Sequence, residues 1–192
     1  EAGAFAVSGI LIGTIDPVSQ AAHQIALVCA SFTFMVSMGL AQGGSIRTSN
    51  AFGRKDWPSI SNIGKSTMIV GLMYGVFCAI SFVALKDVLP LAFNKEARVV
   101  AMASHLLLFA AIFQMSDSTQ AISAGLLRGI KDVKTPTVLI AIAYWVVGIP
   151  VGCLLAFTFG MGASGIWLGF ITGLTLSAIF LSIRFLKMAG KQ

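Results

Sequence analysis

Residues 98–126 read RVVAMASHLLLFAAIFQMSDSTQAISAGL, a mostly apolar run in which Asp117 is the one acidic residue. A helix needs about 20 predominantly apolar residues to cross the roughly 30 Å hydrocarbon core of a bilayer. Four further runs meet this requirement, at residues 18–46, 59–84, 137–158 and 164–184. The pattern therefore predicts an all-α integral membrane protein.

Residues 1–15 form a sixth, shorter apolar segment. Its apolar part is AGAFAVSGILIGTI, residues 2–15. At 1.5 Å per residue this part covers about 21 Å, which is too short to span a bilayer. We therefore expect a six-helix bundle whose first helix is truncated and has its beginning upstream.

The composition agrees with this class. Of 192 residues, 57% are hydrophobic and 10% are charged, whereas soluble domains average about 45–50% and about 25%. This balance excludes most soluble enzymes and nucleic-acid modules. Cys29, Cys78 and Cys153 lie inside apolar runs without a CxxC spacing, so we interpret them as packing residues and expect no metal site or cofactor.

The net charge of +6 is best explained by membrane orientation. The basic residues lie between the apolar runs, and ten of them fall on one side: Arg47, Arg54, Lys55, Lys65, Arg128, Lys131, Lys134, Arg184, Lys187 and Lys191. The other side holds Lys86, Lys95 and Arg98. The positive-inside rule then predicts that the ten, and the C-terminus, are cytoplasmic. No nucleic-acid partner is needed to explain the charge.

Asp117 lies deep inside its segment, where a carboxylate costs several kcal/mol and usually faces a cavity or a partner. Gln114 and Gln120 stand three residues before and after it, so the three polar side chains share a helical stripe. One interpretation is that the stripe joins helices by hydrogen bonds. The favoured interpretation is a proton or cation site that lines a water-filled cavity.

Glycines predict close helix packing in the last two segments. In the last segment they recur every four residues, at Gly165, Gly169 and Gly173, and small residues at this spacing let helices approach closely. In the fifth segment, Pro150 between Gly148 and Gly152 predicts a kink or weak point.

The connections carry helix-end signals. Asp16 precedes Pro17, which predicts a capping carboxylate before a proline in the first turn. Pro58 and Pro136 lie near the starts of the third and fifth segments. The tetrapeptides GRKD at 53–56 and GIKD at 129–132 match one another, and are interpreted as a weak trace of a repeat.

Two histidines lie within the apolar segments. His23 lies near the outer end of the second segment, beside Gln24. We interpret it as a hydrogen-bonded helix contact rather than a proton relay. His105 has no acidic neighbour on its turn, and the same structural interpretation is favoured.

Several stretches, in this order, resemble the C-terminal half of multidrug and toxic compound extrusion (MATE) transporters, and most closely the NorM-type branch. They are EAGAF, AAHQIAL, FQMSDSTQ, LRGIKD, AYWVVGIPVG and GASGIWLGF. The resemblance covers essentially the whole chain. It implies one six-helix lobe of a twelve-helix transporter, corresponding to helices seven to twelve, with the N-terminal lobe absent and required as a partner.

The resemblance also implies a function. Such transporters expel bulky, often cationic aromatic drugs, driven by an inward Na⁺ or H⁺ gradient, from the bacterial cytoplasmic (inner) membrane. Glu1 and Asp117 match the acids that bind the coupling cation. Phe5 and Gln24 match positions that contact drugs, and Glu96 matches an acidic position in the outer loop that touches cationic drugs.

Three further residues complete the expected substrate site: Phe113, Gln114 and Gln120. Phe113 stands where some relatives have a tyrosine, so any hydroxyl contact to the cation is lost there. With Phe5 it can hold a hydrophobic cation by its aromatic face. Lys95 departs from the acidic pattern expected beside Glu96, which weakens the contribution of that loop.

Three other functions compete with drug transport. A purely structural membrane subunit would have no need for the costly burial of Asp117. A lipid-linked oligosaccharide flippase of a related fold would need a basic central cavity, whereas the buried stripe here is acidic. An intramembrane enzyme would need a nucleophile with its base, or a metal site, at membrane depth. Asp117 has no such partner on its own stripe, and no HExxH or GxSxG motif occurs. A transporter is therefore preferred to an enzyme.

Overall fold

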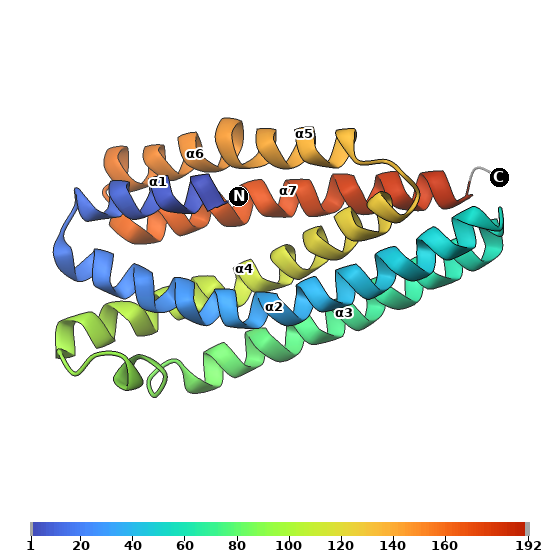
Figure 1. Cartoon of the computed structure of the whole chain (residues 1–192). Coiled ribbons are helices and arrows are strands. Elements are labelled where there is room, and N and C mark those ends of the chain that lie inside the picture. The colour runs from blue at the N-terminus through green and yellow to red at the C-terminus, as the bar shows by residue number, and fades with distance from the viewer. Residues whose placement is uncertain (1, 191–192) are drawn as a thin grey trace.

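The computed structural model describes residues 2–190, and this part of the chain is helical and contains no strand (Figure 1). The helices are α1 (Ala2–Gly13), α2 (Pro17–Gly53), α3 (Trp57–Leu85), α4 (Ala97–Gly129), α5 (Lys134–Ile142), α6 (Ile149–Cys153) and α7 (Gly162–Gly190). A short 3₁₀ turn, η1 (Pro90–Ala92), lies between α3 and α4. The π-helical segments η2 (Ala143–Gly148) and η3 (Leu154–Thr158) join α5 and α6 into one span, Lys134–Thr158.

The all-α membrane class is confirmed. Within the described residues, five helices are long and apolar enough to cross a bilayer, and α1 is a shorter apolar helix. Several helices extend beyond the apolar runs: α2 continues to Gly53 and α7 to Gly190. Hydropathy marks only the part of a helix inside the bilayer, whereas the backbone hydrogen bonds continue beyond it.

The expected cap at Asp16 is present, and a second one matches it. The Asp16 carboxylate accepts hydrogen bonds from the backbone N–H and the hydroxyl of Ser19, at 2.8 and 2.6 Å. Asp56 does the same for Ser59, at 3.1 and 2.6 Å. These hydrogen bonds lower the pKa of both aspartates, and the bonds from the serine hydroxyls have the largest effect. The caps therefore persist at neutral pH and weaken only as the pH falls through the lowered pKa values.

The two matching tetrapeptides are helix C-terminal motifs. Lys55 and Lys131 both adopt the left-handed conformation, with φ of 58° and 65°. The next N–H, of Asp56 or Asp132, donates to the carbonyl five residues earlier at 3.0 Å, which closes α2 and α4 in the same way. The two aspartate side chains have different partners. Asp56 caps α3, whereas Asp132 accepts a hydrogen bond from Arg184 of α7.

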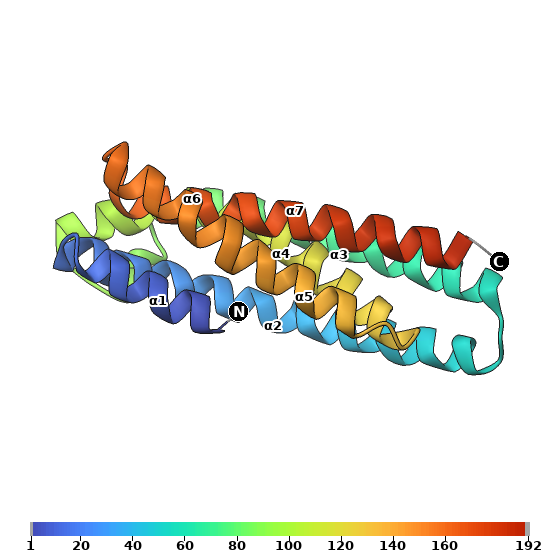
Figure 2. The same cartoon turned by 90° about the horizontal axis from the view of Figure 1, so that it is seen from above.

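Helix α4 lies at the centre of the bundle and packs against α2, α3 and α7 (Figures 1 and 2). Three hydroxyl pairs join it to its neighbours: Ser118 with Ser37 of α2 at 2.7 Å, and Ser116 with Thr175 and Ser123 with Ser182, both of α7, at 2.8 and 2.9 Å. Polar groups of this kind stabilise helix contacts in a membrane.

The glycines of α7 lie directly against the backbone of the Lys134–Thr158 span, as predicted. A Cβ at Gly169 would overlap the carbonyl oxygen of Gly148, and one at Gly173 would overlap that of Ala143. The weak point expected around Pro150 takes the form of two π-helical segments, one on each side of α6. Such bulges are a common response to a missing backbone donor.

Candidate functional site

A cavity of about 130 Å³ lies between α1, α2 and α4. Its lining residues are Phe5 of α1, Leu27, Ala30, Ser31 and Phe34 of α2, and Phe113 and Asp117 of α4. Asp117 is 6% exposed and Phe113 is 2% exposed. The fold thus brings together three residues that the sequence singled out separately: Phe5, Phe113 and Asp117.

Helical periodicity explains this lining. Phe113 and Asp117 are four residues apart and therefore share one face of α4. The α2 residues occupy positions 27, 30, 31 and 34, which is the spacing of one helical stripe. Because α1 connects to α2 through a short turn, it folds back along α2 and presents Phe5 to the same space (Figure 2).

Phe5 is also the hub of an aromatic cluster. Its ring centroid lies 6.0 Å from that of Phe113, 5.8 Å from that of Tyr144 and 5.2 Å from that of Phe170. The first two pairs are edge-to-face, the arrangement that aromatic quadrupoles favour. Phe5 and Phe113 line the cavity, and Tyr144 and Phe170 support Phe5 from behind this wall.

His23 bridges three helices beside this cluster. The Trp167 indole N–H donates to His23 Nδ1 at 3.2 Å, and His23 Nε2 lies 3.4 Å from Ser8 Oγ. Ser8 Oγ in turn donates to the Phe5 carbonyl at 2.7 Å. Because an indole N–H can only donate, Nδ1 must accept and Nε2 carries the proton of a neutral ring. The structural interpretation of His23 agrees with this geometry.

The glutamines beside Asp117 are buried but do not line the cavity. Gln114 is fully buried and Gln120 is 1% exposed. A step of three residues falls 60° short of a full turn, so the stripe winds around α4 and only Asp117 reaches this space. Neither the amide nitrogen nor the oxygen of Gln114 has a hydrogen-bond partner within the described chain.

The other predicted contacts lie elsewhere. Gln24 is exposed on α2, close to Gly9 of α1. Glu96 is exposed at the N-terminus of α4, about 32 Å along the helix axis from Asp117. Glu1 lies outside the residues that the structure describes, so its position relative to Asp117 stays a prediction.

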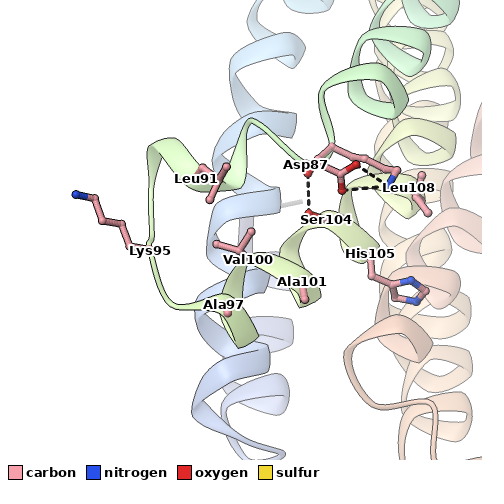
Figure 3. Close-up of a pocket in the computed structure, with 10 residues that line it drawn as sticks. Asp87, Leu91, Lys95, Ala97, Val100, Ala101, Ser104, His105 and Leu108 are labelled. Atoms are coloured by element: carbon pink, nitrogen blue, oxygen red, sulfur yellow. Dashed lines mark hydrogen bonds and ion pairs between the residues drawn. The ribbon is translucent and has the colours of Figure 1, made fainter.

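A larger hollow, of about 580 Å³, lies where the C-terminal end of α3 leads into the N-terminal end of α4 (Figure 3). Lys86 and Asp87 form an exposed ion pair at 3.0 Å, and the Ser104 hydroxyl donates to the Lys86 carbonyl at 2.8 Å. Lys95 points away from the hollow (Figure 3). The charged side chains around this hollow are thus paired or solvated. Among its described lining residues, none is a carboxylate at membrane depth, so the Asp117 cavity is the better candidate site.

Sequence reasoning missed the α2 wall of the cavity. Leu27, Ser31 and Phe34 follow one another at intervals of four and three residues, and that spacing was the available signal. The stripe contains one hydroxyl among apolar side chains, and a lipid-facing stripe would look the same.

Comparisons with known proteins place the chain in a family. The family model MatE matches residues 1–154. The chain is 38% identical to a probable multidrug resistance protein NorM from Agrobacterium fabrum, over 100% of this chain and 42% of that protein. It is also 38% identical to the multidrug resistance protein MdtK of Edwardsiella ictaluri, over 96% of this chain and 41% of that protein.

A solved structure shows the same fold. The eukaryotic MATE transporter AtDTX14 superposes with a TM-score of 0.89 at 22% sequence identity, and the match covers 98% of this chain and 44% of that one. The chain thus spans about two fifths of the length of these relatives. The resemblance stated from the sequence is confirmed, and the family is one of transporters rather than enzymes. The chain belongs to the MatE family.

Proposed function

We propose that this chain is one lobe of a multidrug exporter in which Na⁺ or H⁺ influx drives the expulsion of hydrophobic, often cationic aromatic compounds. The observation that carries the proposal is the cavity that places the Asp117 carboxylate beside Phe5 and Phe113. The names of the relatives, multidrug resistance proteins NorM and MdtK, support the choice of cargo.

The cavity offers two kinds of attraction to such a cargo. Its aromatic walls can hold a cation by their faces, and the carboxylate adds an opposite charge in surroundings of low polarity. Among the described residues that line the cavity, none has a basic side chain, so a phosphate-bearing lipid-linked cargo fits poorly. The buried amide of Gln114, one helical turn from Asp117, supports its assignment as a further polar contact.

The same carboxylate is the proposed site of the coupling cation. Hard cations prefer oxygen ligands, and both Asp117 and Ser31 offer oxygen to this cavity. Within residues 2–190, no three His, Cys, Asp or Glu side chains come together to hold a metal ion. The one carboxylate and one hydroxyl that the described residues supply here suit a weakly held monovalent ion or a proton, and Glu1 remains the predicted second acid of this site.

Coupling follows if the cation and the drug use Asp117 in turn. A cation on the carboxylate cancels the charge that attracts the drug, so the drug leaves. Transport requires in addition that the two ligands favour different conformations, because a ligand shifts an equilibrium only by its differential affinity. The Na⁺ and H⁺ alternatives share this logic.

The test is ethidium efflux from proteoliposomes that contain the full-length protein, under Na⁺ and H⁺ gradients imposed separately. We expect at least one gradient to drive efflux, and Asp117→Asn to reduce it to the leak of protein-free vesicles. Ser118→Ala alters the next residue, whose hydroxyl faces Ser37 rather than the cavity, and should retain efflux. Efflux that ignores both gradients, or that survives Asp117→Asn, would contradict the proposal.

A further inference from the structure

A polar hollow of about 450 Å³ lies between α2 and α3, at the end of the bundle opposite the Lys86–Asp87 pair. From α2 it is lined by Arg47, Asn50 and Arg54, and from α3 by Ser59, Asn62 and Ser66. The efflux mechanism makes no use of this hollow, which lies about 45 Å along α2 from its first residue.

The spacing of these residues makes a two-sided site. On each helix the second and third polar residues lie three and seven positions after the first, so each set forms one stripe along its helix. The two helices are antiparallel and are joined by a tight turn at Lys55, which sets the stripes face to face. The positive-inside rule accounts for basic residues on this side, but it does not account for two amides and two hydroxyls converging on the same hollow.

The positive charge in the hollow is only partly compensated, because the nearby Asp56 carboxylate interacts electrostatically with Arg54. Within the described chain, neither Arg47 nor Arg54 forms an ion pair. The acid in the adjoining turn, Asp56, accepts two hydrogen bonds from Ser59 at the start of α3. Because this carboxylate bonds to Ser59 and forms no ion pair with either arginine, the N–H donors of both guanidinium groups remain available to an external anion.

The position along α2 indicates which anion is available. Arg47 follows Pro17 by thirty residues, about 45 Å along the helix, which matches a bilayer including both headgroup layers. The Arg47 guanidinium group therefore lies at the level of the inner-leaflet phosphates, and Arg54 follows about two helical turns further along α2. Ile63 also lines the hollow, and Ile46 beside Arg47 is 54% exposed, so acyl chains can lie against the same surface.

We infer that this hollow binds the phosphate of an anionic phospholipid from the cytoplasmic leaflet. Arginine forms paired hydrogen bonds with phosphate oxygens, and Asn50 and Asn62 can donate further bonds to the same group. The lipid then bridges the inner ends of α2 and α3. Basic pockets between helices on this side of a membrane are suited to such headgroups.

The test measures retained lipid on the full-length protein by native mass spectrometry, after exchange from mixed phosphatidylglycerol and phosphatidylcholine micelles. We expect Arg47→Gln/Arg54→Gln to lower phosphatidylglycerol retention about tenfold and to leave phosphatidylcholine unchanged. Arg47→Lys/Arg54→Lys keeps both charges but loses the forked donors, so its retention should be intermediate. Lys131→Gln/Lys134→Gln removes two charges from the turn after α4 and serves as the matched control.

Each outcome decides the inference. Equal losses in the arginine and the lysine double variants would mean that bulk charge alone attracts the lipid, which overturns the site. Unchanged retention in the arginine variant overturns it as well. Inorganic phosphate serves as a competitor: if phosphate binds wild-type protein and phosphatidylglycerol does not, the lipid assignment is wrong. No transport is measured, so these results are independent of the proposed efflux.

Discussion

The bundle has a packed side and a cavity side, and both contain polar side chains at membrane depth. On the packed side, α4 hydroxyls pair with hydroxyls of α7, and α7 glycines touch the Lys134–Thr158 span through backbone. On the cavity side, Asp117 shares a hollow with Phe5 and Phe113.

The contrast shows that depth alone does not mark a functional polar residue. Ser123 is fully buried, and its hydroxyl pairs with Ser182 of α7, so this polar group joins two helices. Asp117 differs in having open space and aromatic rings beside it. We therefore expect substitutions on the packed side to change stability, and substitutions on the cavity side to change ligand binding.

The largest effect on stability is expected at Gly169. A methyl group there would collide with the backbone of Gly148 and Gly152, which cannot move aside as a flexible side chain would. Gly169→Ala should lower the free energy of unfolding by about 2–3 kcal/mol, measured by thermal unfolding in detergent. Gly43 has open space where its Cβ would be, so Gly43→Ala should be neutral or stabilising by up to about 1 kcal/mol. Equal effects at the two sites would refute the close packing.

A smaller and more local effect is expected at His23, on the border of the two sides. His23→Leu leaves the Trp167 N–H without its acceptor and releases Ser8 of α1, at a cost of about 1–3 kcal/mol. Hydrogen exchange of the α1 amides should then accelerate by about tenfold or more. His105 is exposed and contacts Phe109 edge-to-face, so His105→Leu should leave α1 exchange unchanged. Slow α1 exchange in both variants would show that the bridge does not hold α1.

The smallest effect is expected at the hydroxyl pairs. Ser123→Ala removes a 2.9 Å contact with Ser182, and such bonds between membrane helices are worth about 0.6 kcal/mol. The double variant Ser123→Ala/Ser182→Ala should be closer to wild type than the sum of the two single changes, because no donor is left unpaired. If Ser123→Ala lowered the free energy of unfolding by more than about 2 kcal/mol, the packed side would depend on hydrogen bonds rather than on close packing.

Much of the fold could be predicted because membrane helices leave strong local signals. The apolar runs located the spans, Asp16 marked a cap, and the α7 glycine repeat marked a close contact. For the π-helical segments around Pro150, the sequence predicted only a weak point in the helix. A π-helical turn contains one more residue than an α-helical turn, and the packing of the neighbouring backbone decides where that residue is inserted.

The site was predictable only in part. The depth of Asp117 was visible from its position in an apolar run. Its spacing of three residues to Gln114 and Gln120 suggested that all three side chains point into one cavity. Each step of three residues rotates the side chain by about 60°, so only Asp117 reaches the cavity. The α2 wall went unnoticed because its apolar stripe is indistinguishable from a lipid-facing one. Which stripes face a cavity is settled by tertiary packing, which no local pattern encodes.

The most direct test of the proposed role of Asp117 is equilibrium binding of a fluorescent cationic drug to the purified full-length protein, titrated with Na⁺ at fixed pH and with H⁺ at fixed Na⁺. If drug and cation share the Asp117 carboxylate, raising the coupling cation should weaken drug binding in the wild type, and this dependence should vanish in Asp117→Asn. Drug affinity that is independent of both cations in the wild type, or a cation dependence that persists in Asp117→Asn, would contradict the shared site.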